Sequence, residues 1–252
     1  MRSQAQPPVL PSPFRTAGEH ISVELPGARV VFTTRRGGRS QGPYESLNLG
    51  LLTADDRELV AANRRLLAAA LGVEFAYGRQ VHGDQVSVAT QPTVPGGELL
   101  DADGQATAAA GLAPLVLTAD CLPIALAAPG AVAMVHAGWR GLAGGVIAAG
   151  VRALRELARP GPIHAAIGPG AGVCCYEAGE EVHEALREWG PDVRRDRHAD
   201  LKLAARRQLR ASGVGAVQDV ALCTICSGAE WFFSHRRDGP VTGRQAGVAW
   251  LS

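Results

Sequence analysis

Four segments of the chain repeat apolar residues at the spacing of an amphipathic helix. The first begins at Thr53, where Asp56 three residues later gives a pattern similar to a capping box, and it ends at Gly72. The second covers residues 142–158, and Pro160 prevents it from continuing. The other two helices are expected at residues 179–189 and 201–211.

Short apolar runs between turn signals predict β-strands. A Pro-Gly turn divides residues 21–33 into two of them. The remaining strands are expected at residues 80–89, 115–119, 122–128, 131–136, 163–167, 217–220 and 248–251. No Rossmann GxGxxG or Walker phosphate loop follows any strand, and strands and helices alternate without a regular order. We therefore expect one mixed domain over residues 19–252, after a flexible N-terminal tail of residues 1–18.

The composition excludes several classes of protein. The 252 residues include 25 Lys+Arg and 24 Asp+Glu, a formal net charge of +1, so no broad basic field is available to bind nucleic acid. No run of 18 apolar residues is present, which excludes a membrane-spanning helix. Residues 1–18 lack the apolar core of a secretory signal, so the five cysteines are expected in the reducing cytoplasm, without disulfides.

Residues 112–145 place a cysteine and a histidine on neighbouring strands. The segment is typical of a strand, a tight bend, a strand, a Pro-Gly turn at residues 129–130, a strand and a glycine-rich corner before a helix. If the turn is symmetric, His136 faces Pro123, and Cys121 is its diagonal neighbour. Diagonal neighbours on one face lie roughly 7–8 Å apart, so we expect these two side chains to lie side by side.

This cysteine and histidine have three interpretations. They are a buried thiol beside a core histidine, a nucleophilic dyad, or two ligands of a metal ion. A metal needs a further ligand, and His82 precedes Gly83 at the start of an expected strand. Two histidines and one cysteine would leave one position of a zinc ion open, as in catalytic sites. Other histidines compete for this role: His20, His164, His183, His198 and His235. We interpret His183 and His198 as exposed polar positions.

Five motifs occur in a recognisable order: RQVHGDQV, TADCLPIAL, VHAGWRGLAGG, GPGAGVCCYEAG and FFSHRRDGPVTGRQAG. Together they resemble the YfiH-type laccase-domain family, long labelled multicopper polyphenol oxidases and now regarded as purine nucleoside phosphorylases. The resemblance covers nearly the whole chain after the tail. It implies an α+β fold, a mixed α/β sandwich grouped with cysteine-hydrolase-like proteins, and a zinc ion held by His82, Cys121 and His136.

The resemblance also implies a reaction. Phosphate would cleave adenosine, inosine or guanosine to the free base and ribose 1-phosphate, so a purine nucleoside and phosphate are the expected partners. Cleavage of methylthioadenosine and deamination of adenosine are further activities that the resemblance implies. Copper in place of zinc, with polyphenol oxidase activity, is an alternative, although the sequence has no paired HxH elements for a multicopper cluster.

Phosphate binding requires cations and N–H groups. Arg140 is the first candidate because it lies in the corner between a strand and a helix N-terminus, where the helix dipole also favours anions. Further candidates are Arg35, Arg36 and Asn48 in one glycine-rich segment, followed by Arg236, Arg237 and Arg244. For proton transfer we prefer Asp120, which is adjacent to Cys121, and Asp103 competes with it.

The other four cysteines allow two interpretations. Cys174 and Cys175 are adjacent, and Cys223 and Cys226 form a CxxC motif. They could form a second metal site or a redox pair, but a CxxC motif indicates a metal strongly only when a second pair follows it at the right spacing. We therefore interpret most of them as buried apolar thiols. A hydrolase or deamidase with Cys121 as nucleophile remains the alternative function.

Overall fold

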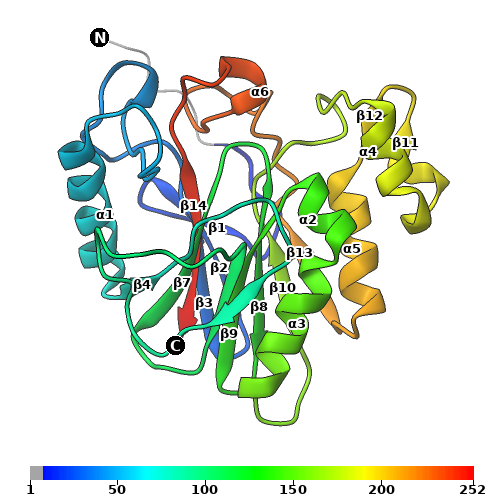
Figure 1. The fold of residues 1–252 in the computed structure, drawn as a ribbon, viewed down its shortest axis with the longest axis horizontal. Coiled ribbons are helices and arrows are strands. Elements are labelled where there is room, and N and C mark those ends of the chain that lie inside the picture. Colours follow the sequence, from blue (N-terminus) through cyan, green and yellow to red (C-terminus); the bar gives the residue numbers. More distant parts are fainter. Residues whose placement is uncertain (1–7) are drawn as a thin grey trace.

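The computed structural model, which describes residues 8–252, contains two six-stranded β-sheets that lie face to face (Figure 1). The first sheet has the strand order β1 (Arg15–Ala17), β2 (His20–Leu25), β3 (Ala28–Phe32), β14 (Gln245–Leu251), β7 (Leu112–Thr118) and β4 (Glu74–Ala76). The second has the order β13 (Ala216–Asp219), β10 (His164–Ile167), β8 (Leu122–Ala128), β9 (Ala131–Ala137), β6 (Gly104–Thr107) and β5 (Val86–Val88). Both sheets contain parallel and antiparallel pairs, which confirms the expected mixed sandwich.

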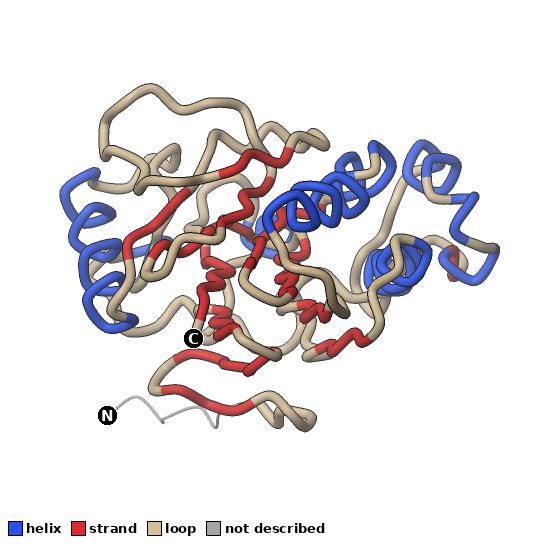
Figure 2. Tube along the Cα trace, turned by 90° about the horizontal axis from the view of Figure 1, so that it is seen from below, coloured by secondary structure: helices blue, strands red, loops and turns tan. Residues whose placement is uncertain are grey.

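Helices cover both outer faces of the sandwich, as Figure 2 shows from below. The α-helices are α1 (Arg57–Leu71), α2 (Trp139–Gly144), α3 (Val146–Leu157), α4 (Glu180–Ala185), α5 (Leu201–Ala211) and α6 (His235–Asp238). Shorter elements are the 3₁₀ helices η1 (Gly42–Tyr44), η2 (Arg187–Trp189) and η3 (Pro191–Val193), and a small ribbon of β11 (Arg194–Arg195) with β12 (His198–Ala199). α1 packs on the first sheet, and α3 and α5 pack on the second.

Successive side chains of the central strands enter different cores, because side chains alternate in direction along a strand. In β3, Val30 and Phe32 lie between the two sheets, whereas Val31 packs in the core beneath α1. In β8, Ala125 lies between the sheets and Ile124 belongs to the core beneath α3 and α5. These strands are buried on both faces, which explains their nearly continuous apolar sequences.

Three predicted helices differ from the structure, and the one expected at residues 179–189 is the α-helix α4 followed by the 3₁₀ helix η2. α1 begins after Asp56, whose carboxylate accepts the N–H of Glu58, so the predicted start at Thr53 is wrong. The helix expected at residues 142–158 is two helices, α2 and α3, which separate at Gly145. The φ of Gly145 is 89°, a left-handed conformation that interrupts a helix and favours glycine. α5 has the predicted bounds and is capped by Asp200.

The strand predicted at residues 80–89 is wrong over most of its length, since only β5 is a strand there. The N–H groups of residues 81–83 donate to the carboxylate of Asp103 rather than to a neighbouring strand. β1, β4 and β6 were not predicted, and β1 lies within the expected tail, where Phe14 is also buried. Residues 1–7 of that tail lie outside the described residues.

No helix within residues 8–252 combines the length and the apolar composition that are needed to cross a bilayer.

Candidate active site

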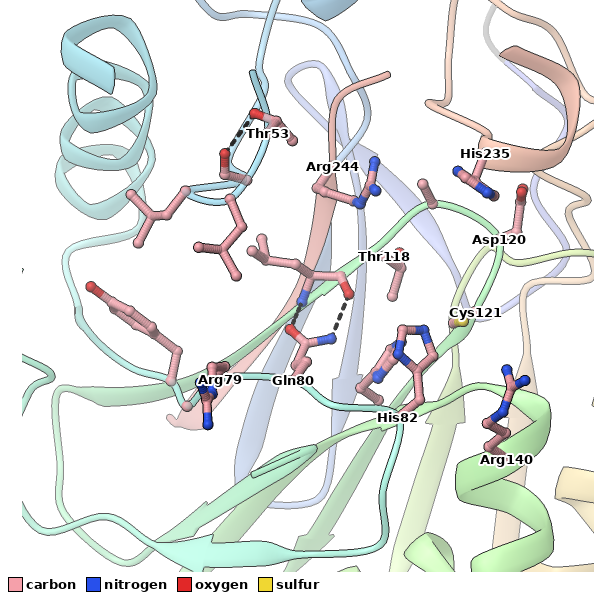
Figure 3. Close-up of a pocket in the computed structure, with 18 of the residues that line it drawn as sticks. Thr53, Arg79, Gln80, His82, Thr118, Asp120, Cys121, Arg140, His235 and Arg244 are labelled. Carbon is pink, nitrogen blue, oxygen red and sulfur yellow. Dashed lines mark hydrogen bonds between the residues drawn. The ribbon is translucent and has the colours of Figure 1, made fainter. Parts of the chain in front are cut away.

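The β8–β9 hairpin has the predicted register, and it brings Cys121 and His136 together. His136 pairs with Pro123, and Cys121 immediately precedes β8. The loop before β5 adds His82, whose ring centroid lies 4.9 Å from that of His136. One donor atom from each of His82, Cys121 and His136 lies within 4.8 Å of the others. Figure 3 shows His82 and Cys121 side by side at the end of the sheet. We call these three residues the trio; their donor atoms are close enough to share a metal ion.

The buried carboxylate of Asp103 contacts the ring of His136 and the loop that carries His82. Its Oδ1 lies 2.7 Å from Nδ1 of His136, and its two oxygens accept the N–H groups of residues 81–83, including that of His82. Because Nδ1 is engaged, the other ring nitrogen of His136 is the one available to Cys121 or to a metal. Burial would raise the pKa of Asp103, but His136 and the N–H groups hold it below its usual value.

The backbone near the trio has features that allow the three side chains to lie close together. A Cβ atom at Gly138 would lie 2.9 Å from Sγ of Cys121 and 3.2 Å from Cδ2 of His82, so a larger residue there would displace both ligands. His82 and Asp120 have φ angles of 61° and 99°, in a region that non-glycine residues rarely adopt. Backbone strain of this kind is concentrated at functional sites, which supports a functional assignment of the trio.

Without a metal, the side chains of Cys121 and His136 form an ion pair. Burial would raise the pKa of the Cys121 thiol, but the charge of His136 and hydrogen bonds from both histidines lower it to about 6. Burial would lower the pKa of His136, but Cys121 and Asp103 raise it to about 9. The trio therefore presents a thiolate near neutral pH, the form of cysteine that binds metals and acts as a nucleophile.

The trio lines a cavity of about 430 Å³, a volume typical of small-molecule sites. The cavity walls also carry the aromatic rings of Tyr77 and Tyr176. Five arginines line it as well: Arg64, Arg79, Arg140, Arg236 and Arg244. The cavity thus combines flat aromatic surfaces with positive charge, which suits a ligand with a ring and an anionic group.

Arg140 has the fewest polar contacts of these five arginines. Its Cζ lies 4.2 Å from the ring centroid of Trp139, and within residues 8–252 its guanidinium forms no hydrogen bond or ion pair. Arg236 and Arg244 each donate to backbone carbonyls through one nitrogen. The guanidinium of Arg140 is therefore free to bind an anion.

Two predicted phosphate-binding residues do not line the cavity. Arg35 donates to three backbone carbonyls, and Asn48 is fully buried and accepts the backbone N–H of Arg244. Both side chains hold loops in place, so the geometry gives them a structural role instead of contact with a ligand. Arg36 and Arg237 are likewise paired with acidic neighbours and lie outside the cavity lining.

The two acidic candidates for proton transfer have different positions. Asp120 lines the cavity, accepting the hydroxyl of Thr224 at 2.6 Å and the backbone N–H of Arg236 at 2.7 Å. Asp103 is fully buried behind His136, and the N–H groups and imidazole already occupy its oxygens. Asp120 is therefore the carboxylate that a ligand in the cavity would meet.

Arg64, in the middle of α1, lines the cavity although it was not among the residues predicted from the sequence. Its side chain is buried against the ring of Tyr77, with Cζ 4.2 Å from the ring centroid, and its Nε donates to a backbone carbonyl. Within the described part of the chain, neither terminal nitrogen of Arg64 has a hydrogen-bond partner. In the sequence, the burial of Arg64 is indicated by its spacing. Asn63 and Arg64 lie on the same helix face as Val60 and Leu67.

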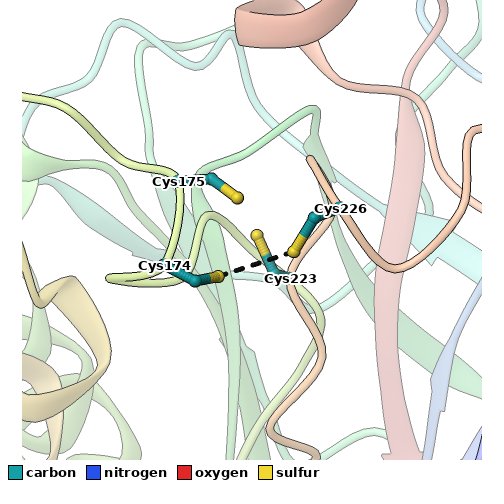
Figure 4. Close-up of side chains that lie close together, drawn as sticks. All are labelled: Cys174, Cys175, Cys223 and Cys226. Atoms are coloured by element: carbon teal, nitrogen blue, oxygen red, sulfur yellow. Dashed lines mark hydrogen bonds between the residues drawn. The ribbon is translucent and has the colours of Figure 1, made fainter.

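The remaining cysteines form a second cluster, which does not line the cavity (Figure 4). The sulfur atoms of Cys174, Cys175, Cys223 and Cys226 all lie within 4.8 Å of one another and could hold a metal ion. Cys223 is buried, Cys175 is half-buried, and Cys174 and Cys226 are exposed, so the interpretation of most of the four as buried apolar thiols is wrong. His183, expected to be exposed, is buried on α4.

Residues 29–252 match the family described as multi-copper polyphenol oxidoreductase laccase. A purine nucleoside phosphorylase of Deinococcus radiodurans is 42% identical over 235 residues, which cover 88% of each chain. One from Corynebacterium glutamicum is 38% identical over 234 residues, which cover 88% of this chain and 94% of that protein. The solved structure of the YfiH protein of Bacillus licheniformis has a TM-score of 0.87 and 31% identity, and the match covers 96% of this chain and 100% of that one. The chain and these proteins are therefore similar over nearly their full lengths.

Proposed function

The chain belongs to the family described as multi-copper polyphenol oxidoreductase laccase, with relatives named purine nucleoside phosphorylases at 38% and 42% identity, and we propose that it is a zinc-dependent purine nucleoside phosphorylase. The observation that carries the proposal is the convergence of His82, Cys121 and His136 at a cavity that also contains a free arginine.

The trio fits a catalytic zinc site. Two imidazoles and one thiolate are donors that zinc prefers, and three protein ligands leave a coordination position open. Asp103 behind His136 is the carboxylate–histidine arrangement that typically orients a ligand and raises its basicity. When bound, zinc would supply a positive centre that polarises a group of the substrate. The same set of two histidines and one cysteine also accepts copper, so elemental analysis must identify the bound metal.

The proposed reaction needs the positive charge of the cavity. In phosphorolysis, a phosphate oxygen bonds to C1′ of the ribose while the bond from C1′ to the purine nitrogen breaks. We assign phosphate binding to Arg140, supported by Arg236 and Arg244, because guanidinium groups match the geometry of phosphate oxygens. Holding phosphate beside the sugar turns an encounter of two molecules into a step within one complex.

We assign the purine and ribose to the rest of the cavity. The rings of Tyr77 and Tyr176 offer surfaces for a flat base. Asp120 is the cavity carboxylate that would pass a proton to the nitrogen of the departing base, and the proton would come to it from the acidic phosphate. Methylthioadenosine fits the same scheme, since it differs from adenosine only on the ribose. Deamination of adenosine is a further proposed activity of this site.

An assay of purified, zinc-loaded protein with inosine tests the proposal. With phosphate present, we expect hypoxanthine and ribose 1-phosphate in equal amounts, and without phosphate we expect neither. Adenosine, guanosine and methylthioadenosine are the parallel substrates, and formation of inosine from adenosine without phosphate would report deamination. Absence of free base from every nucleoside in the presence of phosphate and zinc would overturn the proposal.

The Cys121–His136 ion pair supports a second candidate, a hydrolase or deamidase in which Cys121 attacks the substrate. The two functions differ in what zinc does to the thiolate. A phosphorylase that uses Cys121 as a zinc ligand loses reactivity toward iodoacetamide when zinc is added. A hydrolase that uses Cys121 as nucleophile keeps that reactivity in its active form.

A further inference from the structure

Two loops far apart in the sequence bring four sulfur atoms together. Cys174 and Cys175 follow β10, and Cys223 and Cys226 follow β13, the parallel neighbour of β10 in the second sheet. All four sulfur atoms lie within 4.8 Å of one another, and those of Cys174 and Cys226 are 3.5 Å apart (Figure 4). A tetrahedral zinc ion with Zn–S bonds of about 2.3 Å requires sulfur atoms roughly 3.8 Å apart. The observed cluster is therefore the right size for such an ion.

The CxxC segment is folded so that backbone N–H groups surround one sulfur. The N–H of Gly172 donates to Sγ of Cys223 at 3.3 Å, and the N–H groups of Ile225 and Cys226 point to the same sulfur. A thiolate that accepts several N–H groups is prepared to bind a metal cation.

An apolar role does not explain the cluster. Cysteines that act as small apolar residues are among the most buried side chains, whereas Cys174 and Cys226 are exposed. A disulfide would account for at most two sulfur atoms at a time, and it requires them about 2.05 Å apart. All four sulfur atoms instead share one small volume that has an open side, through which an ion could enter.

The cluster is connected to the wall of the cavity. Thr224, inside the CxxC segment, donates its hydroxyl to Asp120, and its carbonyl accepts Arg237. Tyr176, directly after Cys175, lines the cavity. An ion at the cluster would thus fix the two loops that position Asp120 and Tyr176, without touching a ligand in the cavity.

We propose that Cys174, Cys175, Cys223 and Cys226 bind a second zinc ion, in a closed tetrathiolate site that holds these two loops together. Four cysteine ligands leave no open coordination position, which is typical of structural zinc sites. This site is independent of the trio, since the two clusters share no residue.

Metal analysis of the full-length protein tests the proposal, with Cys121→Ser as the matched variant. This variant removes the thiolate ligand of the trio and leaves the four-cysteine cluster intact. We expect it to retain one zinc per chain by elemental mass spectrometry. After exchange with Co²⁺, it should show the intense sulfur-to-cobalt charge-transfer absorption and long-wavelength bands of a tetrathiolate site. The double variant Cys174→Ser, Cys226→Ser should lose that ion, with circular dichroism as the check of folding.

The outcomes separate this site from the trio. A Cys121→Ser protein that is folded but free of metal would overturn the four-cysteine site, even if the wild type holds zinc. A disulfide between Cys174 and Cys226 in protein purified under reducing conditions, found by peptide mass spectrometry, would also overturn it. If the wild type and Cys121→Ser hold the same single ion, the four-cysteine site stands and the zinc of the proposed function fails.

Discussion

Oδ1 of Asp103 lies 2.7 Å from Nδ1 of His136, and both side chains are buried. The same carboxylate accepts the backbone N–H of His82, so one acidic residue holds the ring of His136 and the backbone of His82. Asp103 thereby fixes which nitrogen of His136 faces Cys121. This contact defines Asp103 as a positioning residue rather than the proton-transfer group that the sequence also allowed.

Replacing Asp103 by Asn should weaken metal binding at the trio by about 10- to 100-fold, since a neutral amide orients His136 less well and does not raise its basicity. Competition with a chromogenic chelator measures the affinity. Asp101→Asn is the control. Asp101 lies two residues before Asp103 in the sequence, and its exposed carboxylate pairs with Arg79 instead of with the trio. Equal affinities of the two variants would contradict the positioning role.

Replacing Gly138 by Ala should displace the trio while the fold persists. The added Cβ would lie 2.9 Å from Sγ of Cys121, closer than such contacts occur. We expect loss of the trio metal, measured per chain, with an unchanged circular dichroism spectrum. Gly144→Ala, at the end of the helix that follows Gly138, is the control, because its Cβ would lie at an ordinary 3.5 Å from Asp84. Full retention of metal by the Gly138 variant would show that the three donors do not share an ion.

Replacing Arg140 by Met should lower kcat/KM for phosphate by roughly 10- to 100-fold, the effect of losing a hydrogen bond to a charged group worth about 1.5–3 kcal/mol. The KM for inosine should change little. Steady-state rates over a range of phosphate concentrations provide the test. Arg152→Met, on the exposed side of α3, should behave like the wild type. Unchanged phosphate saturation in the Arg140 variant would remove this residue from the phosphate site.

Replacing Arg64 by Met should leave the ligand-free protein as stable or more stable, because two buried guanidinium nitrogens lack partners within residues 8–252. Inosine and phosphate should raise the Tm of the wild type more than that of this variant, since a ligand that pairs with Arg64 stabilises the folded state. Arg65→Met, exposed on the next position of α1, is the control. Equal ligand-induced shifts in all three proteins would refute a ligand contact.

The alkylation rate of Cys121 in metal-free protein should rise with pH and level off above about pH 6, the pKa to which its histidine neighbours lower it. Below that pH the thiol is protonated and reacts slowly, whereas an ordinary thiol still gains reactivity up to about pH 8.5. Peptide mass spectrometry after iodoacetamide treatment follows this one cysteine. Zinc should protect it at every pH where the ion binds. A rate that continues to rise through pH 8 would contradict the ion pair with His136.

The sequence was most informative where contacts are local. The Pro-Gly turn at residues 129–130 set the hairpin register and hence the proximity of Cys121 and His136, as the structure confirms. His82 could be added firmly only through family resemblance, because its loop is positioned by Asp103 and not by any local repeat. That loop was mistaken for a strand for the same reason.

Contacts between segments that are far apart in the sequence could not be predicted from local sequence patterns. Arg64 reaches the cavity from an outer helix, and only its position on the apolar face of α1 distinguished it from a surface arginine. The four-cysteine cluster requires the parallel pairing of β10 and β13, which no short motif specifies. Arg35 and Asn48 lie in a glycine-rich segment that is typical of ligand loops, yet their hydrogen bonds serve the loops themselves.

Anomalous diffraction at the zinc absorption edge, from crystals of the protein purified with zinc, tests the shared metal site most directly. We predict a peak about 2.0–2.1 Å from one nitrogen of His82 and one of His136, and about 2.3 Å from Sγ of Cys121. A map without a peak at this position, with the three side chains ordered, would contradict the account.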